Sequence, residues 1–126
     1  MADSLRQHRP TETELLSFEL ANLEFRPNQL EVLAGGLRVG LTVREFHTLL
    51  ALALRPDRVV HRSEIYADVW GGKMAYRDRS VDVFVRKVRQ KLERVAPEWR
   101  YIHTHFGIGY RFAPELNGHD PFRRSP

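Results

Sequence analysis

The chain has 126 residues, of which 42% are hydrophobic and 29% are charged, as expected for one soluble globular domain with a modest core. It contains no cysteine, which excludes disulfides, thiolate nucleophiles and cysteine-based zinc sites. The formal net charge of +4 favours a polyanionic partner, and without any apolar run of about 18 residues we expect a cytoplasmic protein rather than a membrane protein.

Short β-like segments follow a polar start. Residues 1–14 have neither periodicity nor a secretory signal, and predict a flexible tail or the end of an interdomain linker. The next segment, to residue 40, breaks at Ala21-Asn22, Pro27-Asn28 and Gly35-Gly36, a spacing typical of hairpins in a small antiparallel sheet. The predicted strands are Leu16–Leu20, Leu23–Arg26, Gln29–Leu33 and Leu37–Gly40.

A first helix is indicated by its N-terminal cap. Thr42 and Glu45 have the spacing of a capping box, in which each side chain satisfies the backbone amide of the other residue. The helix should run from about Val43 to Leu54, because Arg55-Pro56 disfavours helical backbone beyond that point. Its buried face should carry Phe46, Leu49, Leu50, Ala53 and Leu54.

A second helix is predicted to begin near Arg62 and to stop at Gly71-Gly72. The residues that it should bury are Ile65, Val69 and Trp70. His61 occupies its N-cap position, although histidine is a poor capping residue. Residues 71–76 are then expected to form a loop.

The third predicted helix, at about residues 79–95, has two chemically opposite faces. One apolar stripe carries Val81, Val85, Val88, Leu92 and Val95, and the opposite face carries Arg79, Arg86, Gln90 and Arg94, with Lys87 beside them. Between Arg77 and Arg94, seven basic residues stand against three acids, so this segment supplies a net charge equal to the +4 of the whole chain. Most charged helix faces do no more than contact solvent. A helix face that is positive throughout and that supplies the entire net charge of the chain instead predicts a recognition helix for the major groove of DNA.

The last predicted element is a hairpin. Its strands, Trp99–His105 and Tyr110–Ala113, flank a turn at residues 106–109 that contains two glycines. A polar tail is expected at residues 115–126, so that one domain spans residues 15–114. The order of elements predicts an α+β fold, a winged helix-turn-helix with an N-terminal antiparallel β-sheet, three helices and a C-terminal β-hairpin wing.

Several short motifs, in their order and spacing, resemble the C-terminal effector domain of OmpR/PhoB-type response regulators across roughly residues 16–113. The matching motifs are Leu41-Thr42, Glu45-Phe46, Leu49-Leu50, Val69-Trp70-Gly71, Asp78-Arg79-Ser80-Val81-Asp82-Val83, Arg86-Lys87-Val88-Arg89 and Gly107-Ile108-Gly109-Tyr110-Arg111-Phe112. The resemblance implies a bacterial two-component response regulator that binds specific promoter DNA. Its third helix would lie in the major groove and its wing over the minor groove, and no cofactor is implied.

The resemblance also implies site residues and partners. Residues implied to face DNA are Arg79, Ser80, Val83, Phe84, Arg86, Lys87 and Arg89, and residues implied to contact its backbone are Trp70, Thr104 and Tyr110. In the loop before the third helix, the residues implied to contact RNA polymerase are Lys73, Met74 and Tyr76. The protein would associate with the nucleoid, and two copies would pair head to tail on direct repeats of double-stranded DNA.

The sequence departs from the family pattern at three positions. Phe106 stands where the wing of the family commonly presents an arginine to the minor groove. Phe84 replaces a residue that is often polar, and it lies about 60° from the centre of the apolar stripe, at the edge of the expected core. The third position is His61, a weak cap for the second helix. In addition, the 126 residues do not include the phosphoacceptor receiver domain that is usual in the family.

Other functions are also weighed against the sequence. His103 and His105 share one face of a strand and could chelate a metal, but no third ligand is evident, and no acid, base and nucleophile set indicates an enzyme. Single-stranded nucleic acid would call for aromatic residues along a groove, and only Phe84 and Phe106 qualify. The main alternative is a winged-helix protein-interaction module, which has no need to concentrate its positive charge on the third helix.

Overall fold

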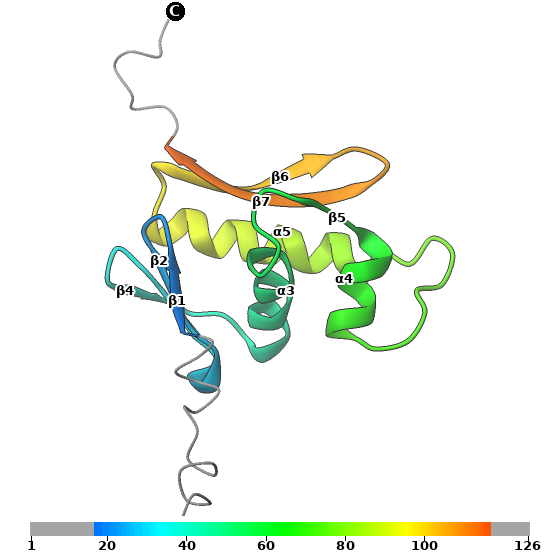
Figure 1. The fold of residues 1–126 in the computed structure, drawn as a ribbon, viewed down its shortest axis with the longest axis horizontal. Helices are drawn as coiled ribbons and strands as arrows, with labels where there is room; N and C mark the ends of the chain where they lie inside the picture. The colour runs from blue at the N-terminus through cyan, green and yellow to red at the C-terminus, as the bar shows by residue number, and fades with distance from the viewer. Residues whose placement is uncertain (1–16, 117–126) are drawn as a thin grey trace, which may run out of the picture.

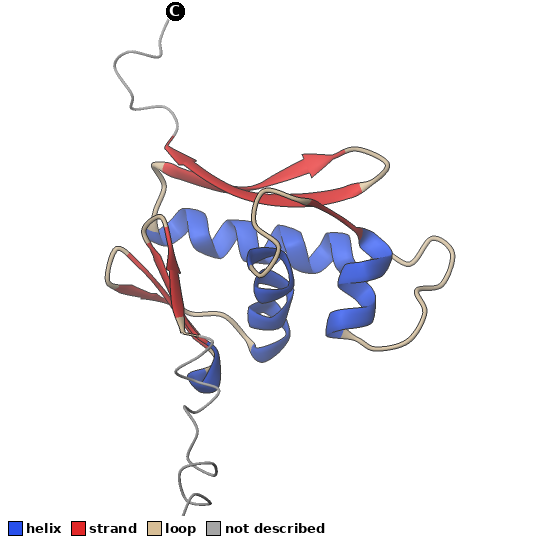
Figure 2. Cartoon of the chain, viewed as in Figure 1, coloured by secondary structure: helices blue, strands red, loops and turns tan. Residues whose placement is uncertain are grey.

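Two antiparallel sheets flank three α-helices in the computed structural model, which describes residues 17–116 (Figure 1). The N-terminal sheet has the strand order β1-β2-β3-β4 and the C-terminal sheet the order β5-β7-β6. The longest helix runs beneath the C-terminal sheet, and the two shorter helices lie on the side of this helix that faces away from the sheet (Figure 2). The predicted N-terminal tail and all but two residues of the predicted C-terminal tail lie outside the described residues.

The N-terminal sheet confirms most of the predicted strands. It consists of β1 (Phe18–Leu20), β2 (Leu23–Arg26), β3 (Glu31–Ala34) and β4 (Leu37–Val39). The predicted strand at 29–33 begins too early, because Pro27–Gln29 form a turn of 3-10 helix and Leu30 has a positive φ of 53°. Proline favours this turn because its ring holds φ near the helical value.

Helix α3 (Val43–Ala53) has the predicted capping box. Thr42 Oγ1 accepts a hydrogen bond from the amide of Glu45 at 3.2 Å, and Glu45 Oε1 accepts one from the amide of Thr42 at 2.8 Å. The predicted buried face is wrong at its end, because Leu54 lies beyond the last helical turn and is 51% exposed. Leu52 is fully buried instead, since α3 packs against other elements around most of its circumference.

A short strand that the sequence analysis did not predict precedes the second helix. β5 (Val59–His61) pairs with β7, and α4 (Arg62–Val69) begins directly after it. The weak cap at His61 is supplemented by Glu64, whose carboxylate accepts a hydrogen bond from the His61 amide at 3.0 Å. As predicted, α4 buries Ile65 completely, and Val69 and Trp70 pack against the core.

Helix α5 (Ser80–Val95) confirms the predicted amphipathic helix. Its stripe residues Val81, Val85, Val88 and Leu92 are at most 2% exposed, and Val95 is partly buried against the same core. In the part of the chain that the structure describes, no helix is long and apolar enough to cross a membrane.

The wing is longer than predicted. Strands β6 (Trp99–His105) and β7 (Gly109–Leu116) form the hairpin, so β7 runs three residues beyond the predicted end at Ala113. At the other edge of β7, Val60 pairs with Tyr110 and His61 with Gly109. The wing therefore forms two strands of a three-stranded sheet, and the third strand, β5, leads directly into α4.

Replacing Leu92 by alanine is expected to lower the free energy of unfolding by about 2–5 kcal/mol, because Leu92 is 2% exposed and the smaller side chain leaves a cavity between α5 and the core. A urea melt measures the loss, and Leu54→Ala, at a position 51% exposed, provides the control. A loss below about half a kcal/mol for Leu92→Ala, as is usual at surface positions, would contradict this burial.

Candidate nucleic-acid interface

The exposed side of α5 carries cationic side chains. Arg86, Lys87 and Arg94 lie on the face opposite the buried stripe and are exposed, as is the side chain of Arg79 just before the helix, at 78%. No acidic residue lies between Asp82 and Glu93, so Arg86 and Lys87 in the middle of the helix form a positive surface that attracts a polyanion.

Two of the seven basic residues counted in the sequence are used inside the fold. Lys91 reaches back to α3, where its Nζ lies 2.7 Å from Oε1 of Glu45, a residue only 3% exposed. Burial raises the pKa of Glu45, but hydrogen bonds from Lys91 and from the Thr42 amide outweigh it and leave this pKa below the usual value. Lys91 thus compensates a buried charge and is not part of the cationic face.

Arg89 is the second of these residues. Its guanidinium donates to Thr104 Oγ1 at 2.5 Å and lies 5.4 Å from the ring centroid of Tyr110. Burial lowers the pKa of Arg89, and among the described residues its Nε has no hydrogen-bond partner. Arg89 was predicted to face DNA and Thr104 to contact the DNA backbone, and the structure joins the two side chains to each other across α5 and β6.

Asp82 connects α5 to α4 and to the wing. Its Oδ1 lies 2.8 Å from Nε of Arg62 and also accepts a hydrogen bond from the hydroxyl of Tyr110, and its Oδ2 lies 3.3 Å from Nε of Arg79. Burial raises the pKa of Asp82, but the hydrogen bonds from Tyr110 and Arg62 outweigh it and hold this pKa below its usual value. Tyr110, predicted to contact the DNA backbone, is 5% exposed and holds Asp82 in place.

Asp82 and Arg62 belong to the site although neither was predicted as a site residue. Asp82 had a local signal, since it lies three residues after Arg79 on one helix face. Arg62 had none, because its ion pair spans twenty positions of the chain.

An aromatic cluster joins the end of α4 to α5. The Trp70 ring stacks on Tyr66 at a centroid distance of 5.3 Å and meets the edge of Phe84 at 5.4 Å. Arg44 lies over Trp70, and Lys87 lies over Phe84 with its Nζ 4.7 Å from the centroid. Phe84 is therefore at the core edge, as its helical phase predicts, and it supports Lys87.

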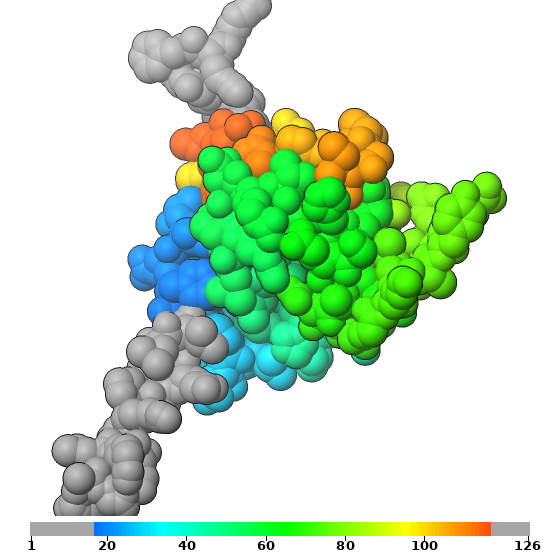
Figure 3. All heavy atoms as spheres, turned by 45° about the vertical axis from the view of Figure 1, so that its right-hand side comes forward, coloured from blue at the N-terminus to red at the C-terminus, as the bar shows by residue number. Residues whose placement is uncertain are grey.

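The loop between α4 and α5 projects from the body of the molecule (Figure 3). Tyr76 is 87% exposed, with the guanidinium of Arg77 5.2 Å from its ring centroid, and Lys73 is also exposed. Met74, which was implied to contact RNA polymerase together with them, is partly buried and packs against the core. A flexible thioether side chain fills such a gap readily, which anchors the base of the loop.

The two histidines of the wing are both hydrogen-bonded. His103 is 8% exposed and its Nε2 lies 2.8 Å from the carbonyl of Ala113, and Nε2 of His105 accepts a hydrogen bond from Arg111 at 3.1 Å. Within residues 17–116, no group of three His, Asp or Glu side chains is arranged to hold a metal.

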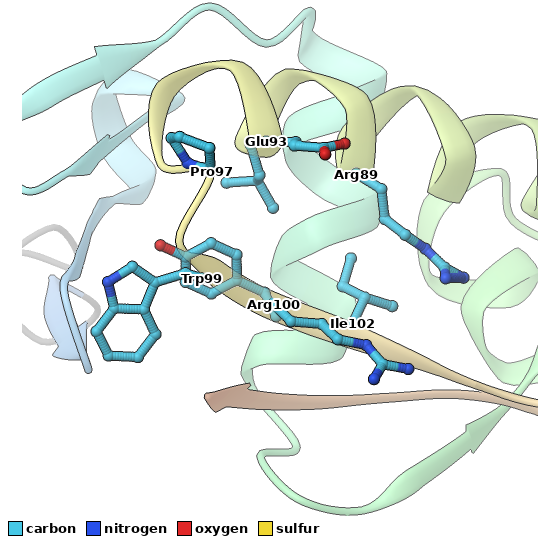
Figure 4. Close-up of a pocket in the computed structure, with 8 residues that line it drawn as sticks. Arg89, Glu93, Pro97, Trp99, Arg100 and Ile102 are labelled. Atoms are coloured by element: carbon cyan, nitrogen blue, oxygen red, sulfur yellow. The ribbon is translucent and has the colours of Figure 1, made fainter. Parts of the chain in front are cut away.

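A pocket of about 260 Å³ lies between the C-terminal half of α5 and β6. Pro97 and Trp99 lie at one end, and the guanidinium groups of Arg89 and Arg100 lie at the other (Figure 4). Ligand sites for small molecules usually enclose about 300–1,000 Å³, so this hollow is small for that purpose.

Two helices packed under a third, with a cationic outer face and a hairpin directly after it, define a winged-helix domain. The family described as "Transcriptional regulatory protein, C terminal" matches residues 36–112. The chain belongs to this family, and its relatives are response-regulator domains of the OmpR/PhoB type.

Individual relatives agree with this assignment. Transcriptional regulatory protein SrrA of Staphylococcus aureus is 32% identical over 115 residues, which are 90% of this chain and 47% of SrrA, so the chain spans about half of that relative. The Klebsiella pneumoniae RstA DNA-binding domain, solved in complex with the RstA box, has a TM-score of 0.70 at 31% identity, covering 78% of this chain and 97% of that one. The DNA-binding domain of CpxR from E. coli has a TM-score of 0.70 at 27% identity, covering 77% and 95%.

Proposed function

We propose that this domain is a sequence-specific, double-stranded DNA-binding transcription regulator that places α5 in the major groove and the wing over the minor groove. The observation that carries the proposal is the exposed cationic face of α5, opposite a fully buried stripe. The major groove is about 12 Å wide and admits an α-helix, and the phosphates on either side attract Arg and Lys. The complex of the related RstA domain with its DNA box supports the proposal.

The contacts divide into two groups, mainly by exposure. The exposed residues Arg79, Val83, Arg86 and Lys87 are proposed to meet DNA, the arginines at guanine or phosphate and the 44%-exposed Val83 at a thymine methyl. The partly buried Ser80, at the first position of α5, is proposed to meet DNA with them. The partly or fully buried residues Trp70, Phe84, Arg89, Thr104 and Tyr110 are proposed to hold α5 and the wing in register, because their polar groups or rings already have partners within the protein.

The proposal is tested by binding the chain to genomic duplex fragments over a series of salt concentrations and sequencing the retained fragments. A shared sequence among them is the expected result. Retention without any preferred sequence would favour the alternative, a winged-helix module that binds protein. Single-stranded competitor is expected to displace little of the bound duplex.

We propose further that two copies bind side by side, because one small module buries only about 600–1,000 Å² of its surface on DNA. The N-terminal sheet of one copy would meet the C-terminal part of the next on direct repeats about one helical turn apart. Inserting about 5 base pairs between the half-sites turns the second to the opposite side of the duplex and is expected to abolish cooperative binding. A footprint in which cooperativity survives this insertion would rule out the arrangement.

The projecting loop is proposed to contact RNA polymerase through Lys73 and Tyr76, with Met74 anchoring its base. Lys73→Ala together with Tyr76→Ala is expected to leave duplex affinity unchanged and to abolish activation in a reconstituted transcription assay. Met74→Ala is expected to lower the stability of the domain more than it lowers activation, because that side chain packs against the core. Full activation by the double variant would refute the contact with RNA polymerase and would mean that the loop only connects α4 to α5.

A further inference from the structure

The tip of the wing is apolar and exposed. Phe106 is 89% exposed and Ile108 46%, and the turn residues 106–109 contain no charged side chain. Gly107 between them has a φ of +77°, which lets the turn reverse within a few residues. Phe106 and Ile108 are exposed next to each other, and exposed apolar side chains that cluster mark candidate interaction sites.

Two backbone hydrogen bonds and one close backbone approach hold the base of the tip. The Ile108 amide donates to the carbonyl of His105 at 2.9 Å, and the amide of Arg62 donates to the carbonyl of Ile108 at 3.3 Å. Gly109 approaches β5 so closely that a Cβ there would lie 1.9 Å from the carbonyl oxygen of Val60. Phe106 is therefore presented on a stiff support that is tied to the first residue of α4.

The tip lies on the same side of the molecule as the N-terminal end of α5 (Figure 1). The Asp82 network fixes this arrangement, since Asp82 on α5 bonds both to Arg62 at the start of α4 and to Tyr110 in the wing. In the proposed complex, with α5 in the major groove and the wing over the minor groove, Phe106 at the tip would face the minor groove.

We infer that Phe106 acts as an apolar wedge that enters the minor groove between two stacked base pairs and kinks the duplex. The inference rests on the proposed binding of duplex DNA. An uncharged tip has no attraction to phosphate, but an inserted aromatic ring exchanges base–base stacking for base–ring stacking and loses its exposure to water. The kink bends DNA toward the major groove that holds α5, and pyrimidine–purine steps under the tip are preferred because they unstack most easily.

The experiment uses the full chain and a duplex of about 40 base pairs, about four helical turns, that wild-type protein retains from a random pool. Fluorophores at the two ends report bending by energy transfer, and the same titration gives Kd. Wild type is expected to bend the duplex by about 20–90°. Phe106→Ala is expected to remove the bend and to raise Kd by roughly five- to 160-fold, the range for removal of one base–aromatic stack.

Two further variants separate the wedge from other causes. Phe106→Arg is expected to bind without the bend and with a salt slope steeper by up to about 0.9, because it adds one cation near phosphate. Leu54→Ala removes an exposed apolar side chain at the end of α3, outside the turn at residues 106–109, and is expected to keep both the bend and Kd. Circular dichroism of each variant checks that its fold is retained.

The outcomes are distinct. Loss of the bend in Phe106→Ala with the α5 footprint retained supports the wedge. An unbent duplex with wild-type protein, or an equal bend with Phe106→Ala, overturns the wedge while duplex binding stands. If wild type does not bend the duplex and Phe106→Ala loses the cooperative binding of two half-sites, the wedge is overturned in favour of a contact between protein copies. Failure of wild type to retain any duplex overturns both the wedge and the proposed function.

Discussion

Changing Arg86 and Lys87 together to alanine is expected to weaken duplex binding more than any other change on the surface of α5. Both side chains are exposed in the middle of the helix, and Lys87 is further supported by the ring of Phe84 at 4.7 Å. Removing one cation from a phosphate reduces the slope of log K against log salt by about 0.9, so the slope of the double variant should fall by up to about 1.8. Affinity should fall by at least about tenfold, since one good interaction contributes roughly 1–3 kcal/mol.

The measurement is a set of Kd values from about 50 to 200 mM salt, the range over which phosphate contacts change affinity most visibly. Arg26→Ala together with Arg38→Ala provides the control, because it removes the same charge from the N-terminal sheet. Both double variants are measured on a duplex with a single half-site, so that contacts between copies do not contribute. A general charge effect would lower affinity equally in both double variants. Unchanged affinity and slope in the α5 variant would refute the assignment of α5 as the recognition helix.

Replacing Gly109 by alanine is expected to be the most destabilising small substitution in the wing. The added Cβ would lie 1.9 Å from the Val60 oxygen and 2.8 Å from its carbonyl carbon, both of them backbone atoms that cannot rotate away. Strand β7 must then separate from β5, where Gly109 pairs with His61. Overpacking costs about 1–3 kcal/mol and occasionally more, so we expect about 3 kcal/mol or more here.

Thermal and urea unfolding measure this loss, and Gly40→Ala is the matched control. Within residues 17–116, apart from the chain neighbours of Gly40, no atom lies within 4 Å of the place its methyl group would take. Gly40→Ala should change stability by less than about 1 kcal/mol. Wild-type stability in Gly109→Ala would contradict the close approach of β7 to β5. Partial loss of duplex binding is also expected, since Gly109 supports the wing tip.

Elements whose signals are local were predicted well. The capping box of Thr42 and Glu45 and the apolar stripe of α5 depend on residues within a few positions of one another, and both are confirmed. The hairpin is also local, so its strands were found to within three residues. Strand β5 was missed because three residues are too few for an alternating pattern to appear, and its pairing partner lies some fifty positions away.

The sequence by itself determined the winged-helix order of elements and the opposite faces of α5, because helical periodicity and turn residues act at short range. Only the tertiary structure decided which cations are free. Lys91 bonds to Glu45 across 46 positions, and Asp82 bonds to Tyr110 across 28. Periodicity assigns a side chain to a face but not to a partner, since the partner is set by how separate elements pack. Packing therefore engages Lys91, Arg89 and Tyr110 within the protein and leaves Arg86 and Lys87 exposed on α5.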